Sequence, residues 1–593
     1  MTEPGIGRRA HLGLLLAAAL LLLVGLGRVD AWAPDEPRYL QVAEEMRALP
    51  HGAASAVVLH LNGRPYDQKP PLYFWLAALA GAPAGRVSEA AARLPSALAG
   101  LALVALTLAL GTRLLGGRTG LLGAGILLTT FEFAHLARRV QLDVVLALLE
   151  TAALALFWRI DRGIGRRALQ VGALHLCLGL AVLTKGPVGF LVPVLAIAVY
   201  LAWERRLRDL PRSLPFWALP LSLGPGLAWL AAAASVSGGG FAAGAVGENL
   251  IGRFFAGTSH DRPFYYYLYQ LPVDFLPWTL LAPAIFVAAR TRVFGAAPES
   301  GSDADERRAA PLDAAAEAAA VALHGERRHR AVQRAWRFLL SIVGASVLFF
   351  SLSSGKRGLY LLPAFPALAL LTADALVREL AGRTRLPRAI AVGLATGAGA
   401  VLALGLAALG AGLFHGSFER GRELAGAVDP IGLAAFGGAT AAVAIGAVAA
   451  WVVLRRNGVA SLRRLPVVVG AAWAVLAAAF QLLYPALDGL RSPRPIAVAA
   501  AAVTPEGEPI GLVSDRAMAG GLLYYGGRPV ATLRSAESVR AFLDGGGRTF
   551  VVKQRKLERV TAHVPVREVS RSRAGRRAVL VVVADDAVAG AVR

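Results

Sequence analysis

The sequence predicts an all-α polytopic membrane protein that carries a small soluble α/β domain at its C-terminal end. Of its 593 residues 56% are hydrophobic and the mean hydropathy is +0.55, and apolar segments of about 20 residues recur along the chain. These segments stop near residue 485, and short β-type runs follow. A net charge of +23 would suggest nucleic-acid binding in a soluble chain, but most of the arginine lies between apolar segments, where it orients helices. We therefore expect no nucleic-acid partner.

The first apolar segment, residues 12–27, follows Arg8 and Arg9. Pro34 directly after Ala31-Trp32-Ala33 argues against cleavage of a signal peptide, so we expect an uncleaved span with a cytoplasmic N-terminus. Further segments bring the expected number of transmembrane helices to about thirteen. They lie near 93–112, 120–137, 143–158, 169–185, 187–203, 214–234, 273–289, 338–354, 359–379, 389–414, 430–454 and 465–485.

Alternating these spans places an arginine cluster in every cytoplasmic loop, as the positive-inside rule expects. The clusters include Arg113 and Arg118, Arg159 to Arg167, Arg205 to Arg212, Arg307 to Arg330, Arg383 to Arg388, and Arg455 to Arg464. Two large loops, 29–92 and 235–272, then face the outer side together with the C-terminal region. The outer loops are expected to form short helices beside the membrane.

The domain organisation follows from composition. Residues 1–488 form the expected membrane domain, within which 290–337 is polar and Ala/Glu-rich and predicts a disordered cytoplasmic loop. Residues 489–593 form the expected α/β domain.

The strands of that domain are expected at 509–514, 529–533, 549–553 and 578–584. A helix is predicted to begin after Ser535 as its N-cap and to stop at the glycines 545–547.

Lysine and arginine residues in the outer loops do not follow the positive-inside rule, so their presence there needs another explanation. Lys69, Lys185 and Lys356 each stand beside a Gly or Pro turn, and Arg253, His260 and Arg357 fall on the same expected side. Ammonium and guanidinium groups form charge-assisted bonds to phosphate, so these residues predict a site for an anionic lipid-linked substrate. The alternative is that the lysines snorkel at helix ends.

Five motifs in order resemble one known family. They are Ala33-Pro34-Asp35-Glu36-Pro37-Arg38-Tyr39, Asp67-Gln68-Lys69-Pro70-Pro71, Leu183-Thr184-Lys185-Gly186-Pro187, Arg253-Phe254-Phe255 with His260 and Pro263-Phe264-Tyr265-Tyr266, and Phe350 to Lys356. Together they look like the bacterial aminoarabinose transferases of lipid A and their relatives in the protein-mannosyltransferase-like superfamily. These are C-type glycosyltransferases (GT-C), and the resemblance covers the membrane region to about residue 380.

The resemblance implies a GT-C fold in the bacterial inner membrane, with the C-terminal domain in the periplasm. It also implies transfer of a sugar from a polyprenyl phosphate carrier to an acceptor such as lipid A, another envelope glycan or a protein. Lys69 and Arg253, with Lys185 and Lys356, would bind the donor phosphate. Asp35 would act as base toward an acceptor hydroxyl or orient an acceptor that is already anionic, and Asp143 matches the second acidic position.

Each acid also has a structural alternative. Asp35 could simply cap a helix over 37–48, and Asp143 could pair with Arg138 or Arg139. Glu36 is expected to be a structural partner of an arginine in the same loop, such as Arg38.

Metal binding is a further open point. In the aminoarabinose transferases the residue before Lys-Pro-Pro is Glu, which with the loop histidine is the expected metal pair, whereas this chain has Gln68. An amide oxygen is a poorer partner for zinc than a carboxylate. His260 could bind a metal, bind phosphate or be a solvated loop histidine.

Aromatic residues surround the site loops, as is typical of a membrane interface. Tyr360 is the candidate for holding a prenyl chain or a sugar face. A transporter or flippase of lipid-linked sugars would also line its cavity with basic residues, and it is the alternative to the enzyme.

Overall fold

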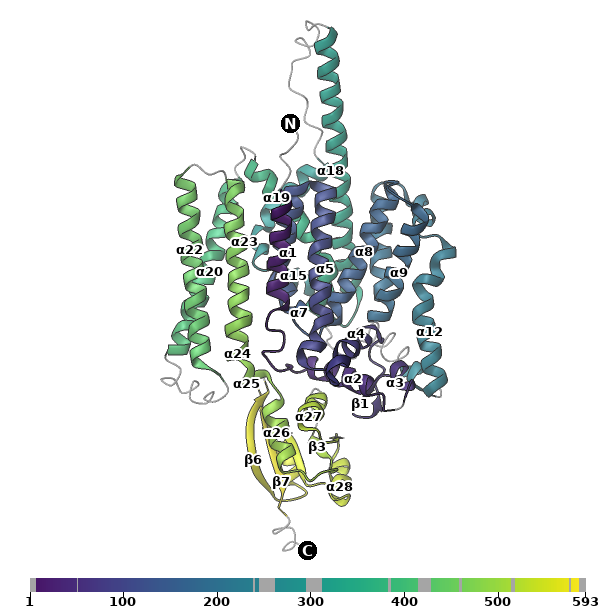
Figure 1. The fold of residues 1–593 in the computed structure, drawn as a ribbon, viewed down its shortest axis with the longest axis vertical. Helices are drawn as coiled ribbons and strands as arrows, with labels where there is room; N and C mark the ends of the chain where they lie inside the picture. The colour runs from purple at the N-terminus through teal and green to yellow at the C-terminus, as the bar shows by residue number, and fades with distance from the viewer. Residues whose placement is uncertain are drawn as a thin grey trace.

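The computed structural model describes residues 7–50, 52–237, 240–244, 262–294, 312–381, 386–413, 428–457, 461–513, 518–574 and 577–585. Most of this part of the chain is a bundle of roughly parallel helices (Figure 1). Helix α18 projects from the end at which the N-terminus lies, and a small sheet hangs from the opposite end (Figure 1).

The helices of the bundle overlap the expected spans, except that the span expected over 273–289 is divided among α15 (Tyr266–Asp274), η5 (Trp278–Leu281) and α16. They are α1 (Arg8–Leu23), α5 (Glu89–Leu115), α6 (Gly117–Thr129), α7 (Phe131–Ala137), α8 (Leu142–Asp161), α9 (Arg167–Lys185), α10 (Val188–Trp203), α12 (Leu219–Ser237), α16 (Ala282–Phe294), α18 (Leu312–Leu352), α19 (Phe365–Ala381), α20 (Leu386–Leu413), α22 (Pro430–Arg456) and α23 (Ser461–Ala478).

Within the described residues, seven helices are long and apolar enough to cross a membrane, and the pair α6 and α7, bent by 68°, makes eight. Helices α1 and α10 have only 16 residues each, and α8 carries Asp143 and Glu150 among its apolar residues. The protein is therefore polytopic, while the number of thirteen spans stays a prediction.

The predicted disordered loop over 290–337 is wrong where the structure describes it. Residues 290–294 belong to α16, and α18 is a continuous helix of 41 residues that begins at Leu312. Alanine and glutamate are strong helix formers, so a stretch too polar to build a core still forms a helix when it extends a buried span. Residues 295–311 lie outside the described part.

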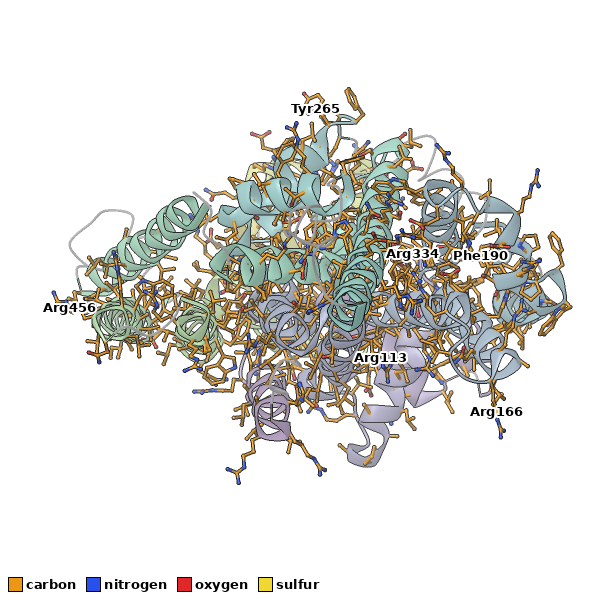
Figure 2. All side chains as sticks on the ribbon, turned by 90° about the horizontal axis from the view of Figure 1, so that it is seen from above. Arg113, Arg166, Phe190, Tyr265, Arg334 and Arg456 are labelled. Carbon is orange, nitrogen blue, oxygen red and sulfur yellow. The ribbon has the colours of Figure 1, made fainter. Side chains whose placement is uncertain are left out.

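Arginine-rich helix ends gather at the end of the bundle from which α18 projects. Arg113 lies in the last turn of α5, Arg166 precedes α9, and Arg456 ends α22. Figure 2 looks onto this end and labels these three arginines together with Arg334 of α18. The basic loops therefore share one end, as the sequence predicts.

The first large loop lies at the opposite end of the bundle (Figure 1). It contains α2 (Glu36–Ala48), α3 (Ala54–Val57), the two-residue strands β1 (His60–Leu61) and β2 (Arg64–Pro65), and α4 (Leu72–Gly81). Its aromatic residues Tyr39, Tyr66, Tyr73 and Phe74 are buried and pack edge to face. This packing holds the loop as a rigid layer on the bundle.

Between α12 and α19 the chain returns to this end. The short helices α13 (Gly240–Ala243), α15 (Tyr266–Asp274), η5 (Trp278–Leu281) and η6 (Gly358–Ala364) lie there. Tyr267 of α15 donates its hydroxyl to the Arg357 carbonyl at 3.1 Å, which joins the second large loop to the segment that follows α18.

The C-terminal region forms a five-stranded sheet in the order β4-β3-β5-β7-β6. Its strands are β3 (Ile510–Val513), β4 (Val530–Leu533), β5 (Thr549–Lys553), β6 (Val566–Ala574) and β7 (Arg577–Ala584). Strands β4, β3 and β5 are parallel, and β7 and β6 add to them antiparallel.

The sequence predicted four of these strands and missed β6. Strand β6 is an edge strand with Arg567, Glu568 and Arg571 along it, and such charges hide the hydrophobic alternation of a strand while protecting the edge from aggregation. The predicted helix is confirmed as α28 (Ala536–Asp544). Ser535 caps it in a capping box with Ser538, and Gly545 ends it.

Two helices connect this sheet to the bundle. Helix α26 (Arg494–Ala502) packs on the sheet, and α27 (Ala519–Gly526) lies between α26 and α2. The α/β region thus sits directly on α2 of the first large loop. Helix α2 begins at the residue that follows Asp35.

Candidate active site

Asp35 occupies the N-cap position of α2, but its side chain makes no capping hydrogen bond there. Instead its two carboxylate oxygens each accept from a guanidinium: Arg38 Nη2 lies 2.5 Å from Oδ1, and Arg357 Nη2 lies 2.9 Å from Oδ2. The expectation that Asp35 only caps the helix is therefore wrong. The backbone of Asp35 is helical (φ −90°, ψ −43°), whereas a capping side chain usually stands on an extended residue.

The charge of Asp35 is stabilised by its surroundings. Burial by itself raises the pKa of a carboxyl group, but Arg357, Arg38 and Lys69 more than compensate and hold the pKa of Asp35 below its ordinary value. Lys69 is half-buried and interacts electrostatically with Asp35. Asp35 is ionised at neutral pH.

Glu36 points the other way, into the bundle, and is 2% exposed. It pairs with Arg93 of α5, whose Nε lies 2.9 Å from Oε1, and with Arg139, whose Nη2 lies 2.8 Å from Oε2. It also accepts from the backbone N–H of Trp32 and of Val140, both at 2.9 Å. Although burial opposes ionisation, these partners lower the pKa of Glu36 to about 2.

Glu36 is therefore a structural residue, as predicted, but Arg38 is the wrong partner. Consecutive residues at a helix start face different sides. Glu36 therefore contacts the bundle, while Asp35 and Arg38 lie on the side of Arg357. The fixed Glu36 holds the beginning of α2 against the membrane helices.

Asp143 lies at the start of α8 and is 2% exposed. Lys185, the last residue of α9, forms an ion pair with its Oδ1, and Gln141 Nε2 donates to its Oδ2 at 2.7 Å. The predicted alternative, a pair with Arg138 or Arg139, is wrong. Arg138 donates to the Leu21 carbonyl at 2.5 Å and Arg139 pairs with Glu36.

Tyr360 covers the ammonium group of Lys185. Lys185 Nζ lies 4.0 Å from the centre of the Tyr360 ring, which also contacts Phe350 at 5.4 Å between ring centres. This cation–π contact stabilises the charge of Lys185 in a place where water is scarce. One face of the Tyr360 ring is thus occupied by a lysine.

The two acids belong to one site. Arg357 interacts electrostatically with both Asp35 and Asp143. Tyr39 of α2 interacts with the same two carboxylates. Tyr360 follows Arg357 by three residues and touches Lys185. Residues from the first loop, α8, α9 and η6 therefore lie near one another at one end of the bundle, while the site roles of Asp35, Asp143, Lys69 and Lys185 stay predictions.

Lys356 is held away from this cluster. It is 4% exposed, and its Nζ donates to the backbone carbonyl of Ser353 at 2.5 Å and to that of Arg262 at 2.9 Å. These bonds tie the loop after α18 to the chain before α15. These bonds use two of the three N–H donors of the ammonium group, so the assignment of Lys356 to the donor phosphate stays a prediction, whereas the neighbouring Arg357 pairs with Asp35.

Two predicted site residues, Arg253 and His260, lie outside the described residues. Gln68 is half-buried in the loop before α4. Its amide is a weak zinc ligand, so the residues present do not fit the metal pair that the resemblance implies, and we derive no step through a metal.

Sequence reasoning missed two acids near the site. Glu132 of α7 interacts electrostatically with Arg357, Asp143 and Asp274. Asp274 of α15 is 6% exposed and lies against Gly358, where an added Cβ would come within 2.3 Å of its Oδ2. The available signal was an acid inside an apolar segment, which usually marks a functional position.

Comparisons with known proteins agree with this architecture. Residues 9–229 match the family model described as dolichyl-phosphate-mannose-protein mannosyltransferase. The chain is 31% identical over 374 residues to the undecaprenyl phosphate-alpha-4-amino-4-deoxy-L-arabinose arabinosyl transferase of Pseudomonas aeruginosa, which covers 62% of this chain and 59% of that protein. A relative of the same name from Pseudomonas savastanoi is 30% identical and covers 62% of each chain. The chain thus spans about three fifths of the length of these relatives.

The whole chain superimposes on a solved structure. The crystal structure of ArnT from Cupriavidus metallidurans bound to undecaprenyl phosphate has a TM-score of 0.73 with 21% identity, over 97% of this chain and 98% of that one. The apo state of the same protein gives a TM-score of 0.70. The predicted fold class is confirmed apart from the number of spans: the chain is a multi-pass membrane protein with the GT-C fold, and it is similar to the aminoarabinose transferases and the protein mannosyltransferases.

Proposed function

We propose that this protein is an integral membrane glycosyltransferase that moves a sugar from a polyprenyl phosphate carrier to an acceptor at the outer face of the bacterial inner membrane. The observation that carries the proposal is the convergence of Asp35, Asp143, Lys69, Lys185 and Arg357 at one end of the bundle. The similar aminoarabinose transferases carry names that state an undecaprenyl phosphate donor, which supports a polyprenyl phosphate donor for this protein.

The orientation follows from charge. The arginine-rich helix ends lie at the end opposite to the first large loop (Figures 1 and 2). The positive-inside rule places such ends in the cytoplasm, which puts the N-terminus in the cytoplasm and the site, with the α/β domain 489–593, in the periplasm. A polyprenyl carrier in the outer leaflet then presents its phosphate at the level of Lys69.

The reaction is a single displacement with inversion. The bond between the sugar carbon and the carrier phosphate oxygen breaks, a bond from that carbon to an acceptor oxygen forms, and the phosphate leaves with both electrons. Cations stabilise the charge that grows on the leaving phosphate. Lys69 and Lys185 are the described candidates for this role, and Arg253 is the candidate outside the described residues.

The state of Asp35 favours one of its two roles. A carboxylate held by Arg38 and Arg357, with a lowered pKa, is a weak base toward a sugar hydroxyl. It serves better to hold the two guanidinium groups where they orient an acceptor that is already anionic. Because Asp35 is a weak base, a phosphate-bearing acceptor such as lipid A is favoured over another envelope glycan or a protein hydroxyl.

Transport of lipid-linked sugars gains no support from the relatives named above, which are transferases. The test is an assay with purified protein in detergent, a polyprenyl phosphate sugar and a lipid acceptor extract, followed by mass spectrometry of the acceptor. Transfer without a sealed membrane supports the enzyme. Movement of donor only across sealed vesicles, with an unchanged acceptor, would refute it.

The sugar and the acceptor need a second experiment. Envelope glycolipids and glycoproteins from a deletion strain are compared with the parent by mass spectrometry, and the missing substituent identifies both. The sugar fixes whether the activity is that of a pentosyl- or a hexosyltransferase.

A further inference from the structure

The α/β domain touches the first large loop at the turn that carries Asp35 and Arg38. A Cβ added to Gly520 of α27 would lie 2.7 Å from Arg38 Cα and 2.9 Å from the Pro37 carbonyl oxygen. A Cβ on Gly521 would lie 2.6 Å from Pro493 and 3.3 Å from Pro37. The two helix backbones therefore meet directly, and only glycine permits this distance.

Hydrogen bonds fix the contact on both sides. The Tyr525 hydroxyl accepts from the Ala31 backbone N–H and donates to Glu89 Oε1, each at 2.8 Å. The Tyr524 hydroxyl donates to the Val87 carbonyl at 2.9 Å. Both tyrosines belong to α27, so one short helix binds the chain before Asp35 and the start of α5.

The segment just before Asp35 is tied down by the chain that enters the domain. Asp488 accepts from the Asp30 backbone N–H at 3.0 Å and from Trp32 Nε1 at 2.6 Å. Ser492 donates to Asp30 Oδ2 at 2.7 Å. The bonds of Glu36 to Arg93 and Arg139 hold the same turn from the membrane side.

The turn from Asp30 to Arg38 is thus clamped between two bodies, the membrane helices and the α/β domain. The contact at Arg38 Cα decides where the Arg38 guanidinium starts, and that guanidinium lies 2.5 Å from Asp35. A displacement of about 1 Å at a reacting centre can cost about 100-fold in rate.

From this clamp we propose that the α/β domain positions the Asp35–Arg38 turn for catalysis through α27, with Gly520 and Tyr525 as positioning residues. The proposal rests on the proposed function and gives the domain a role in the reaction centre. Neither residue touches substrate; both act through the backbone of α2 and of the chain that precedes it.

The test compares Gly520→Ala with Gly446→Ala in the full-length protein. Gly446 lies in α22, is exposed, and has no atom within 4 Å of an added Cβ, so it is the matched control. Alanine favours helix over glycine at both sites, so only the collision with α2 distinguishes the variants. We expect Gly520→Ala to lower kcat about tenfold with less than about a twofold change in the donor KM.

The pH dependence of kcat in Gly520→Ala distinguishes a displaced Arg38 from a loss of folded protein. Asp35 faces Arg38 and Tyr39 from α2, Arg357 from the segment before η6, and Lys69 from the loop before α4. Moving Arg38 away weakens the interaction that keeps Asp35 ionised, so the acid limb of kcat should move to higher pH in Gly520→Ala. A merely smaller folded fraction would lower kcat and leave that limb in place, which would overturn the proposal.

Amide hydrogen exchange tests the contact between α27 and the Asp35–Arg38 turn without measuring activity, so it does not depend on the proposed function. Amide hydrogen exchange of peptides covering residues 30–47 should speed up about fivefold or more in Gly520→Ala and not in Gly446→Ala. If wild type transfers no sugar, the proposed function fails while faster exchange still supports the clamp.

Equal exchange in both glycine variants would overturn the proposal. If Gly520→Ala does not fold, Tyr525→Phe removes only the hydroxyl between Ala31 and Glu89 and is judged by the same kcat, pH and exchange measurements.

Discussion

Arg357 Nη2 lies 2.9 Å from Asp35 Oδ2, although 322 residues separate the two along the chain. This ion pair joins the first large loop to the segment after α18, and both side chains are mostly buried, at 31% and 16% exposed. It connects the acidic residue of the first motif to the arginine that directly follows the last one. It thereby joins two loops at the same end of the bundle.

Replacement of Asp35 by Asn should abolish most of the transfer without unfolding the protein. Asn keeps the shape but cannot hold two guanidinium groups, so we expect kcat to fall about 100-fold or more. The measurement is the transfer assay, with elution as a single detergent-solubilised species as the control for folding. Near-normal turnover in well-folded Asp35→Asn would contradict the assignment.

The pair of Asp143 and Lys185 allows structure and function to be separated. Lys185→Met leaves Asp143 buried without its cation and should cost about 3 to 5 kcal/mol of stability. The double variant Asp143→Leu with Lys185→Met should recover most of that stability, because neither charge remains buried alone. Transfer should stay lost in the double variant.

Thermal unfolding measures the stability of the single and double variants, and the transfer assay measures their activity. A double variant that regains both stability and transfer would show that the pair only supports the fold.

Glu36 should control the acid stability of the protein. Its pKa is about 2 in the folded state against an ordinary 4.5, so its ion pairs stabilise the fold fully above about pH 4.5. This contribution, about 3 kcal/mol, is lost as the pH falls toward 2. Unfolding temperature measured from pH 6 to pH 2.5 should fall more steeply for wild type than for Glu36→Gln.

Glu36→Gln should also be less stable than wild type at pH 7, because Arg93 and Arg139 lose their counter-charge. Glu506→Gln is the control, since its side chain is 94% exposed. Parallel pH curves for wild type and Glu36→Gln would contradict the assignment.

Lys69 and Lys356 should respond differently to removal of the ammonium group. Lys69→Ala should raise the donor KM about tenfold or more, because a charge-assisted bond to phosphate is lost. Lys356→Met should instead lower stability by about 1 to 3 kcal/mol, because the Ser353 and Arg262 carbonyls lose their donor. Initial rates against donor concentration and thermal unfolding decide between these effects. A raised donor KM with normal stability in Lys356→Met would place this lysine in the donor site.

Chelation should have little effect on transfer. Gln68 is a weak zinc ligand, so we expect EDTA to leave the rate unchanged and purified protein to contain less than stoichiometric zinc. Gln68→Glu, which restores the carboxylate beside Lys69, is the matched variant for metal content measured by elemental analysis. Strong inhibition of wild type by EDTA that zinc reverses would show the opposite.

The fold class and most elements were readable from local patterns. Apolar segments of about 20 residues predict membrane helices because a bilayer offers backbone groups no partner, and Ser535 predicts the start of α28 because its hydroxyl satisfies a free backbone N–H. Strand β6 was not readable because its charged edge carries no alternation. The helix at 312–337 was not readable because composition measures the ability to form a core, which a projecting helix does not need.

The sequence by itself determined that the chain is a polytopic helical membrane protein and that arginine clusters separate its apolar segments, and it predicted that Asp35, Lys69, Asp143 and Lys185 lie on one side. Only the tertiary structure decided the partners: Glu36 with Arg93 and Arg139, Asp143 with Lys185, and Lys356 with two carbonyls. It also decided that α27 rests on the turn of Arg38. The reason is physical: span and side are set by local hydropathy and charge, whereas a pairing depends on the relative rotation of helices distant in sequence, which packing alone fixes.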